Sequence, residues 1–279
     1  MIKSKNSGQT LLIIVLITAV ILTVGLAITT YSITDIKISQ QEEESARAFA
    51  AAEAGIEESL KIGSATNATV GNITAQVSEI IQGGTKDFDF GGLKFESGEL
   101  TNVWLIGHTA DKSLDPSQKF GGSQIKICWG DSNMISDNNP PALEASLIYK
   151  NLSGVYEFIR AGFDPKGGRT KGFENVDSSS GTNCGNLAFA KDIDLTSKTF
   201  ALPDGATPYL LRLKLLYNSD TQPLAVSADS NLPNQGKCFD SSATITSSNI
   251  TRKIRQCQFF DAPPAIFDYV LFSNGSLTK

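Results

Sequence analysis

The stretch "SGQTLLIIVLITAV", residues 7–20, begins an uncharged run that decides the fold of this chain. No Asp, Glu, Lys or Arg occurs between Gln9 and Thr34. Leu11–Thr30 gives about 20 residues, or roughly 30 Å of helix, which matches the hydrocarbon core of a bilayer. Basic residues precede the run and acidic residues follow it, so the positive-inside rule predicts a cytoplasmic N-terminus. We therefore expect one membrane span over about residues 11–31, with most of the chain outside the cytoplasm.

The helix expected for this run continues beyond the membrane. The sequence "DIKISQQEEESARAFAAAEAGIEESLKIG", residues 35–63, is rich in helix-favouring Ala, Glu and Gln, and no proline precedes Pro116. A secretory signal peptide would instead stop at a cleavage site followed by unrelated sequence. We therefore predict one helix over residues 9–62, about 80 Å long. Its second half packs on an outer domain through a predicted apolar stripe of Phe49, Ala52, Ile56 and Leu60. A spanning helix followed by a separate juxtamembrane helix is the alternative.

Beyond Gly63 the pattern changes to short apolar or alternating runs separated by Gly, Asn, Asp, Ser and Pro, which is typical of β-strands. The fold class is therefore α+β, with the long N-terminal helix packed on a β-rich antiparallel sheet or sandwich. We expect residues 63–279 to form this extracytoplasmic domain, and a subdivision near residues 120–145 stays open. The expected strands lie at 123–130, 145–150, 154–160, 208–219, 222–228, 250–260 and 266–273, with a hairpin between the second and the third.

Four cysteines, Cys128, Cys184, Cys238 and Cys257, lie beyond the apolar run, and none is spaced as C-x-x-C. This spacing argues against a zinc ribbon or a thioredoxin-type site. An even number of separated cysteines outside the membrane fits two disulfides in an oxidising compartment. Three pairings are possible, and proximity in the sequence favours Cys128–Cys184 with Cys238–Cys257. Buried free thiols are the alternative.

The charge of the chain bears on its partners. The net charge of −5 becomes more negative if Lys3 and Lys5 are removed. This balance disfavours broad nucleic-acid binding, because phosphate contacts need clustered Lys and Arg. Arg252, Lys253 and Arg255 do cluster, but only the last two share a strand face, so we interpret them as a solvated face. No specific nucleic-acid partner is expected.

Candidate catalytic and ligand-binding residues are few. His108 is the only histidine, which excludes a zinc site with several histidines and leaves one general base, with Asp111 nearby. No G-x-S-x-G motif occurs, so we interpret His108 as a surface residue near a turn. "DFDFGGLKF" (87–95) and "DPKGGRTKGF" (164–173) only superficially match calcium and phosphate loops, and we interpret them as a strand with a turn and as a flexible turn. We expect no enzymatic activity, no metal and no cofactor.

Three segments follow one another from the N-terminus: "KSKNSGQT", the apolar "LLIIVLITAVILTVGLAITTYS", and "ARAFAAAEAGIEESL". Their order and spacing resemble the N-terminus of the type IV pilin superfamily, and most closely that of minor pilins of the PilX-like group. The resemblance covers about the first 62 residues. It implies that residues 1–8 are a leader and that a prepilin peptidase cuts between Gly8 and Gln9. The mature chain, methylated at its N-terminus, then starts at the apolar helix.

One position departs from this pattern. Major pilins carry a glutamate as the fifth residue of the mature chain, and here Ile13 occupies that position. Such a glutamate is suggested to offset the cationic N-terminal amine of a neighbouring subunit, because an unpaired charge at membrane depth is costly. The departure implies a tip or initiating subunit, and the alternative is that Ile13 is one more lipid-facing aliphatic residue. We take the assembly residues to be Ile13, Phe49, Glu53, Ile56 and Leu60.

The predicted function is therefore assembly. A minor-pilin-like structural subunit, inserted in the inner membrane and processed by prepilin peptidase, joins other pilin subunits through its N-terminal helix. The product is a type IV pilus or a related secretion pseudopilus, which carries the β-rich domain on its surface or tip. Two alternatives stay open. One is an anchored module that binds a glycan or other surface ligand without polymerising, and the other is an anchored hydrolase that depends on His108.

Overall fold

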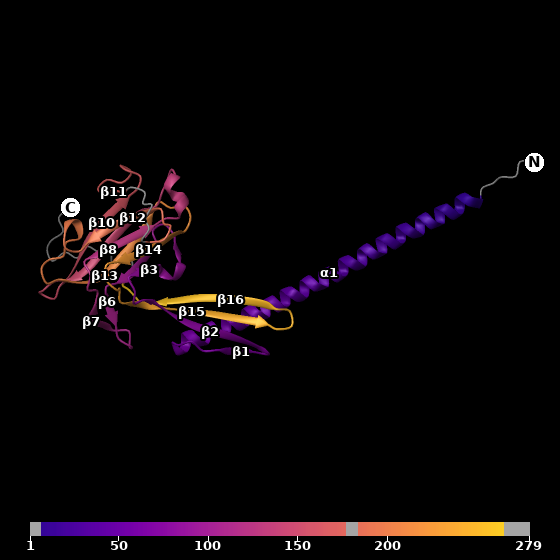
Figure 1. Ribbon diagram of the computed structural model, residues 1–279, viewed down its shortest axis with the longest axis horizontal. Helices are drawn as coiled ribbons and strands as arrows, with labels where there is room; N and C mark the ends of the chain where they lie inside the picture. Colours follow the sequence, from indigo (N-terminus) through magenta and orange to yellow (C-terminus); the bar gives the residue numbers. More distant parts are fainter. Residues whose placement is uncertain (1–6, 177–183, 265–279) are drawn as a thin grey trace, which may run out of the picture. The chain divides into compact units, whose positions relative to one another are not determined.

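The computed structural model describes residues 7–176 and 184–264 and has the predicted α+β class (Figure 1). The strand expected at 266–273 lies outside the described residues. The chain passes between two compact units at three places, after Glu79, Cys238 and Gln256, and none of them lies within residues 120–145. The two units are Met1–Glu79 with Phe239–Gln256, and Ile80–Cys238 with Cys257–Lys279.

Helix α1, Ser7–Ile62, runs through 56 residues without interruption, so no separate juxtamembrane helix forms. The absence of proline and the many Ala, Leu, Glu and Gln residues favour this continuity. The helix begins two residues before Gln9. It ends where Gly63 adopts a left-handed conformation, with φ +79°, and donates its N–H to the Ser59 carbonyl at 2.8 Å.

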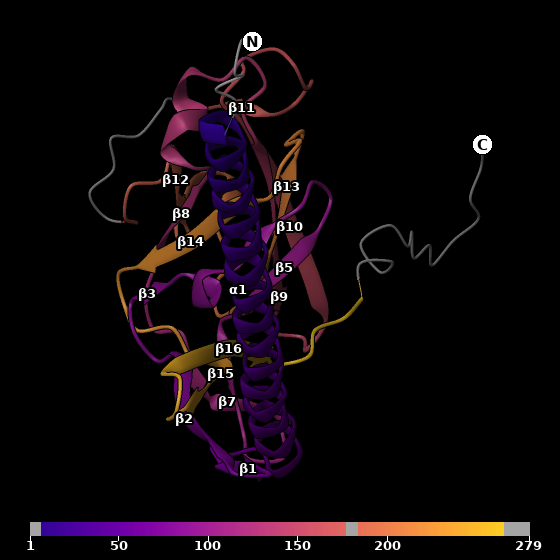
Figure 2. The same ribbon diagram turned by 90° about the vertical axis from the view of Figure 1, so that its right-hand side faces the viewer.

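In the first unit, the C-terminal part of α1 packs on a four-stranded sheet with the order β1-β2-β15-β16 (Figures 1 and 2). The strands are β1 Ala68–Val70, β2 Ile73–Gly83, β15 Asn234–Ile245 and β16 Ile250–Phe259. Small side chains dominate the core between helix and sheet, so the two approach closely. This core consists of Ala48, Ala51, Ala52, Ile73, Ala75, Ala243 and Ile245.

The second unit is a β-sandwich. One sheet has the strand order β11-β10-β9-β13-β5, and the other has the order β12-β8-β14-β3. Strand β4 also pairs with β14. Strands β6 and β7 form a separate two-stranded sheet. One buried cluster takes side chains from both sheets, among them Trp129, Leu147 and Leu211. The strands are β3 Asp87–Phe88, β4 Lys94–Phe95, β5 Leu100–Trp104, β6 Ile106–His108, β7 Leu114–Lys119, β8 Gln124–Trp129, β9 Ala142–Lys150, β10 Tyr156–Asp164, β11 Glu174–Asn175, β12 Phe189–Asp194, β13 Thr207–Leu216 and β14 Gln222–Ala228. Short 3-10 helices are η1 Phe90–Gly92, η2 Ser132–Ser136 and η3 Lys198–Phe200.

The strands with clear patterns form where the sequence predicts them. The expected hairpin is present, because β9 and β10 pair antiparallel with Tyr156 opposite Lys150. Strand β14 alternates buried and half-buried residues over its whole length, as one face of a sandwich strand should. Strand β13 is buried along nearly its whole length: β9 and β5 pair with its two edges, and Leu211 and Leu213 pack in the core of the sandwich.

Both disulfides join the cysteines that proximity in the sequence favours. Cys128 bonds to Cys184, and Cys238 on β15 bonds to Cys257 on the adjacent β16. None of the four cysteines is free, so the alternative of buried thiols is wrong. Gly91 lies directly over the second disulfide, because a Cβ atom there would be 2.9 Å from both sulfur atoms. This close approach explains a glycine in η1.

Candidate assembly surface on the N-terminal helix

The first half of α1 is an exposed apolar surface. Large apolar side chains over residues 11–38 range from 48% exposed at Ile38 to 72% at Tyr31. The most apolar window of 18 residues is wholly exposed within the structure, and the helix is long and apolar enough to cross a membrane. A continuous apolar surface of this size needs lipid or other helices around it.

Five threonine hydroxyl groups of this half are hydrogen-bonded within the helix. Each threonine Oγ1 concerned donates to a carbonyl three or four residues earlier, at 2.8–3.1 Å. Unpaired polar groups are costly in hydrocarbon, so these internal bonds suit a helix surrounded by lipid or by other helices. The residues are Thr18, Thr23, Thr29, Thr30 and Thr34.

The predicted processing and docking positions lie at the start of this surface. Gly8 and Gln9 belong to the first turn of α1. Ile13 follows one turn later and is 54% exposed. An aliphatic side chain at this position offers no charge to the amine of a neighbouring chain.

The second half of α1 presents small residues to its sheet. A Cβ atom added at Gly55 would be 2.8 Å from the Ser241 Oγ atom and 2.9 Å from a methyl carbon of Val77. Only a residue without a side chain fits this approach without movement of its neighbours. Three fully buried alanines of the "AFAAAEAG" stretch share this face, namely Ala48, Ala51 and Ala52.

Phe49 corrects the predicted apolar stripe, because its side chain is 47% exposed. The face of α1 that is buried against the sheet includes Ala48 in place of Phe49, so it is rotated by about one residue from the predicted stripe. The close contact between helix and sheet leaves no space for the Phe49 ring. Ile56 is buried as expected, whereas Leu60 is only half-buried and Glu53 is exposed. Phe49 and Glu53 are four residues apart, so they share an outward face that a neighbouring molecule can contact.

The basic cluster on β16 is mostly solvated, as predicted. The Arg255 Nε and Nη2 atoms form a fork with the Asp240 carboxylate at 2.5 and 2.6 Å, and Lys253 is exposed beside them. The Arg255 hydrogen bonds hold the pKa of Asp240 below its ordinary value. Arg252 lies on the opposite face, where its Nε donates to the Ser45 Oγ of α1 at 2.8 Å.

His108 lies at the end of β6, next to a turn as predicted, but it is half-buried rather than fully on the surface. Its ring stacks on Phe260 at a centroid distance of 4.0 Å and meets Trp104 edge-on at 4.7 Å. Its Nδ1 atom is buried without a hydrogen-bond partner among the described residues. Burial lowers the pKa of His108. Asp111 accepts hydrogen bonds within its own loop, from Ser113 among others, rather than from His108, so the pairing that the hydrolase alternative would need is not formed.

The two acidic residues of "DFDFGGLKF" are structural, as the interpretation as a strand with a turn predicts: Asp87 belongs to β3 and Asp89 caps η1. Asp87 accepts a hydrogen bond from the Ser227 hydroxyl at 2.6 Å, and Asp89 accepts one from the Gly91 N–H at 3.0 Å. Across residues 7–176 and 184–264, no group of three or more His, Cys, Asp and Glu side chains has the arrangement of a metal site.

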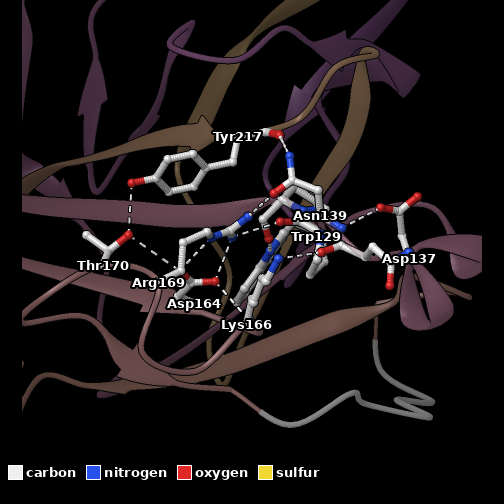
Figure 3. A network of polar contacts seen from close by, with 11 residues as sticks. Trp129, Asp137, Asn139, Asp164, Lys166, Arg169, Thr170 and Tyr217 are labelled. Carbon is white, nitrogen blue, oxygen red and sulfur yellow. Dashed lines mark hydrogen bonds and ion pairs between the residues drawn. The ribbon is translucent and has the colours of Figure 1, made fainter.

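The loop at 164–173 is anchored, which corrects its interpretation as a flexible turn (Figure 3). Asp164 and Arg169 form a two-pronged ion pair at 2.6 and 3.0 Å, with side chains only 2% and 13% exposed. The Arg169 guanidinium also donates to the Asn139 side chain at 2.6 Å and stands 4.1 Å above the Tyr217 ring. The arginine therefore joins three loops, and its hydrogen bonds are satisfied by the protein itself.

Sequence reasoning missed this network because Arg169 finds Asn139 and Tyr217 through the fold, far away along the chain. The only local signal is an acid and an arginine on either side of Gly167 and Gly168.

Comparison of the chain with protein-family models, with curated proteins and with solved structures finds no match. The fold and the surfaces described above therefore carry the functional argument alone.

Proposed function

We propose that this chain is a minor-pilin-like structural subunit of a type IV pilus or a related filament. The observation that carries the proposal is the division of α1 into two halves. Its first half is exposed and uncharged, whereas its second half is bound to a sheet through small residues. A helix that served only as an anchor would need no continuous extension of this kind. Two disulfides agree with a domain that lies in an oxidising, extracytoplasmic compartment.

The subunit is held in the membrane before assembly and moves from there into the filament. The exposed apolar half rests in the inner membrane before assembly, and prepilin peptidase removes residues 1–8 after Gly8. The same half then packs against the helices of other pilin subunits, where apolar contact and close approach at Gly25 replace lipid. Phe49 and Glu53 extend this contact surface outside the membrane.

Ile13 sets the place of the subunit in the filament. A chain with an aliphatic residue there cannot neutralise the N-terminal amine of a subunit that is already assembled, so it enters first or near first. Ile13→Glu should allow incorporation along the shaft. Gold labelling that stays confined to filament ends in this variant would contradict the role of Ile13.

Substitution at the cleavage site tests the proposal as a whole. Gly8→Val, made in the cell that produces the protein, should leave an uncut chain in the membrane and remove it from sheared filaments. Ser7→Ala, one position away in the leader, is the matched control and should be processed and assembled normally. Equal recovery of both variants in the filament fraction would contradict the proposal, as would absence of the unchanged protein from filaments.

A second candidate function has one observation in its favour. The β9–β10 hairpin exposes Leu152, Val155, Tyr156 and Phe158, with exposed fractions from 54% to 79%. An apolar patch of this kind is typical of an interaction site, so an anchored module that binds a surface ligand without polymerising is the alternative. It predicts that Gly8→Val changes neither the mass nor the location of the chain.

A further inference from the structure

The Cys238–Cys257 disulfide lies where the chain leaves and re-enters the second unit. Cys238 is the last residue of that unit before the chain passes into the first unit, and Cys257 is the first residue after its return. Residues 239–256, here called the looped segment, belong to the first unit and form most of the β15–β16 hairpin. The disulfide therefore joins the two ends of a first-unit segment by a covalent bond.

The looped segment completes the first unit. Within residues 7–79, the strands that the chain contributes to the sheet are β1 and most of β2. Two strands alone are marginally stable at best, so the sheet depends on β15 and β16. Side chains of the looped segment and of α1 share one core, which includes Ala243, Ile245, Ala48, Ala51 and Ala52. The second half of α1 is therefore held by a segment from which residues 80–238 separate it along the chain.

The disulfide is shielded within the second unit. Cys238 is wholly buried, and Gly91 of η1 lies directly over both sulfur atoms. The Phe90 ring of η1 is only 1% exposed, and its centroid lies 4.4 Å from that of Phe88. Phe259 of β16 meets the same Phe88 ring edge-on at a centroid distance of 5.9 Å. A bond enclosed by a glycine and an aromatic cluster suits a permanent structural role.

We infer that the Cys238–Cys257 disulfide is a covalent lock on the first unit, which keeps the second half of α1 on its sheet. The first unit opens when β15 and β16 separate from β2 and α1. With the disulfide intact, the looped segment leaves the sheet as a closed loop, so it gains less chain entropy than an open segment would. Opening is therefore suppressed although both cysteines belong to the other unit. This lock is independent of the proposed filament function.

The Cys128–Cys184 disulfide provides the matched comparison. Its two cysteines are 56 residues apart and lie within one continuous stretch of the second unit, residues 80–238. Its loop contains no part of the first unit, so it restricts the unfolded chain of the second unit alone. The two disulfides should therefore act on different units.

Hydrogen exchange of the full-length chain in detergent tests the lock. Two double variants are compared with the unchanged protein, namely Cys238→Ala with Cys257→Ala, and Cys128→Ala with Cys184→Ala. Exchange is followed in the looped segment and in residues 48–62 of α1 for the first unit. Strands β9 and β13 report on the second unit, and their protection also shows whether each variant is folded.

Loss of Cys238–Cys257 should make exchange in the looped segment and in residues 48–62 at least about tenfold faster, because the open state gains chain entropy. Exchange in β9 and β13 should change by less than about threefold in the same variant, since the second unit stays folded. The Cys128–Cys184 variant should show the opposite pattern. Unchanged exchange in the looped segment would overturn the lock. Equal acceleration in both units, including loss of protection throughout the chain, would also overturn it.

Discussion

Gly55 of α1 lies against Ser241 of β15 so closely that a Cβ atom at residue 55 would be 2.8 Å from the Ser241 Oγ atom. A second and a third neighbour, Val77 and Ala75, would be 2.9 Å and 3.1 Å away. The helix backbone at Gly55 therefore lies directly against small side chains of the sheet. This contact fixes which half of α1 belongs to the folded domain and which half is left for lipid or other helices.

Gly55→Val should destabilise the first unit by about 1–3 kcal/mol, because added methyl groups must displace Ser241 and Val77 from a close-packed contact. Hydrogen exchange at β15 in the full-length protein reports the change, as faster exchange around Ala243. Gly25→Val is the matched control in the same helix, since nothing lies within 4 Å of a Cβ atom there. Equal exchange in both variants would show that the close approach does not matter.

Phe49→Ala should separate folding from assembly. Its ring is 47% exposed, so its removal should change the free energy of unfolding by less than about 0.5 kcal/mol. The same variant should be recovered less often in sheared filaments, because the ring is proposed to contact a neighbouring subunit. Ile56→Ala, at a position 6% exposed, should instead cost about 2–5 kcal/mol. A large drop in the free energy of unfolding of Phe49→Ala would contradict this expectation, because it would mean that the Phe49 ring packs in the core.

The sequence predicted the parts of the fold that depend on local pattern. The continuity of α1 follows from helix-favouring residues without proline, and the β9–β10 hairpin follows from alternation around "NLSG". The long helix on a β-rich domain was predicted for the same reasons. The disulfide pairs followed from proximity alone, which is a weak argument that the structure confirms.

What the sequence could not predict depends on distances across the fold. Phe49 has a large apolar side chain, so periodicity placed it in the core, but the sheet approaches too closely to admit it. Arg169 looked like part of a flexible glycine-rich turn, because Asn139 and Tyr217 lie far away in the sequence. His108 stacks on Phe260, more than half the chain later. Such contacts leave no local pattern.

Arg169→Met should destabilise the second unit by about 3–5 kcal/mol, because it leaves the Asp164 carboxylate buried without its partner. Urea unfolding followed by tryptophan fluorescence, from Trp104 and Trp129 of this unit, measures this loss. Lys94→Met breaks the ion pair with Asp131, whose side chains are 47% and 41% exposed, and should cost less than about 1 kcal/mol. Similar midpoints for the two variants would contradict the structural role of the buried pair.

His108 should make the second unit less stable in mild acid. Burial lowers its pKa from the ordinary value of 6.5, so the unfolded chain binds a proton more readily than the folded one. The free energy of unfolding is therefore constant above about pH 6.5, falls as the pH drops below that value, and levels off below the lowered pKa. His108→Phe keeps a ring against Trp104 and Phe260 and should remove this dependence between pH 7.5 and about 5. An unchanged slope in the variant would assign the dependence to other groups.

The proposal that α1 is a processed assembly helix is tested most directly at the N-terminus of the membrane-bound protein. Intact mass and N-terminal sequencing should be compared for the full chain expressed with and without a prepilin peptidase. We expect a chain that starts at Gln9 only when the peptidase is present, with a methyl group on its amine. A chain that starts at Met1 in both cases would contradict it.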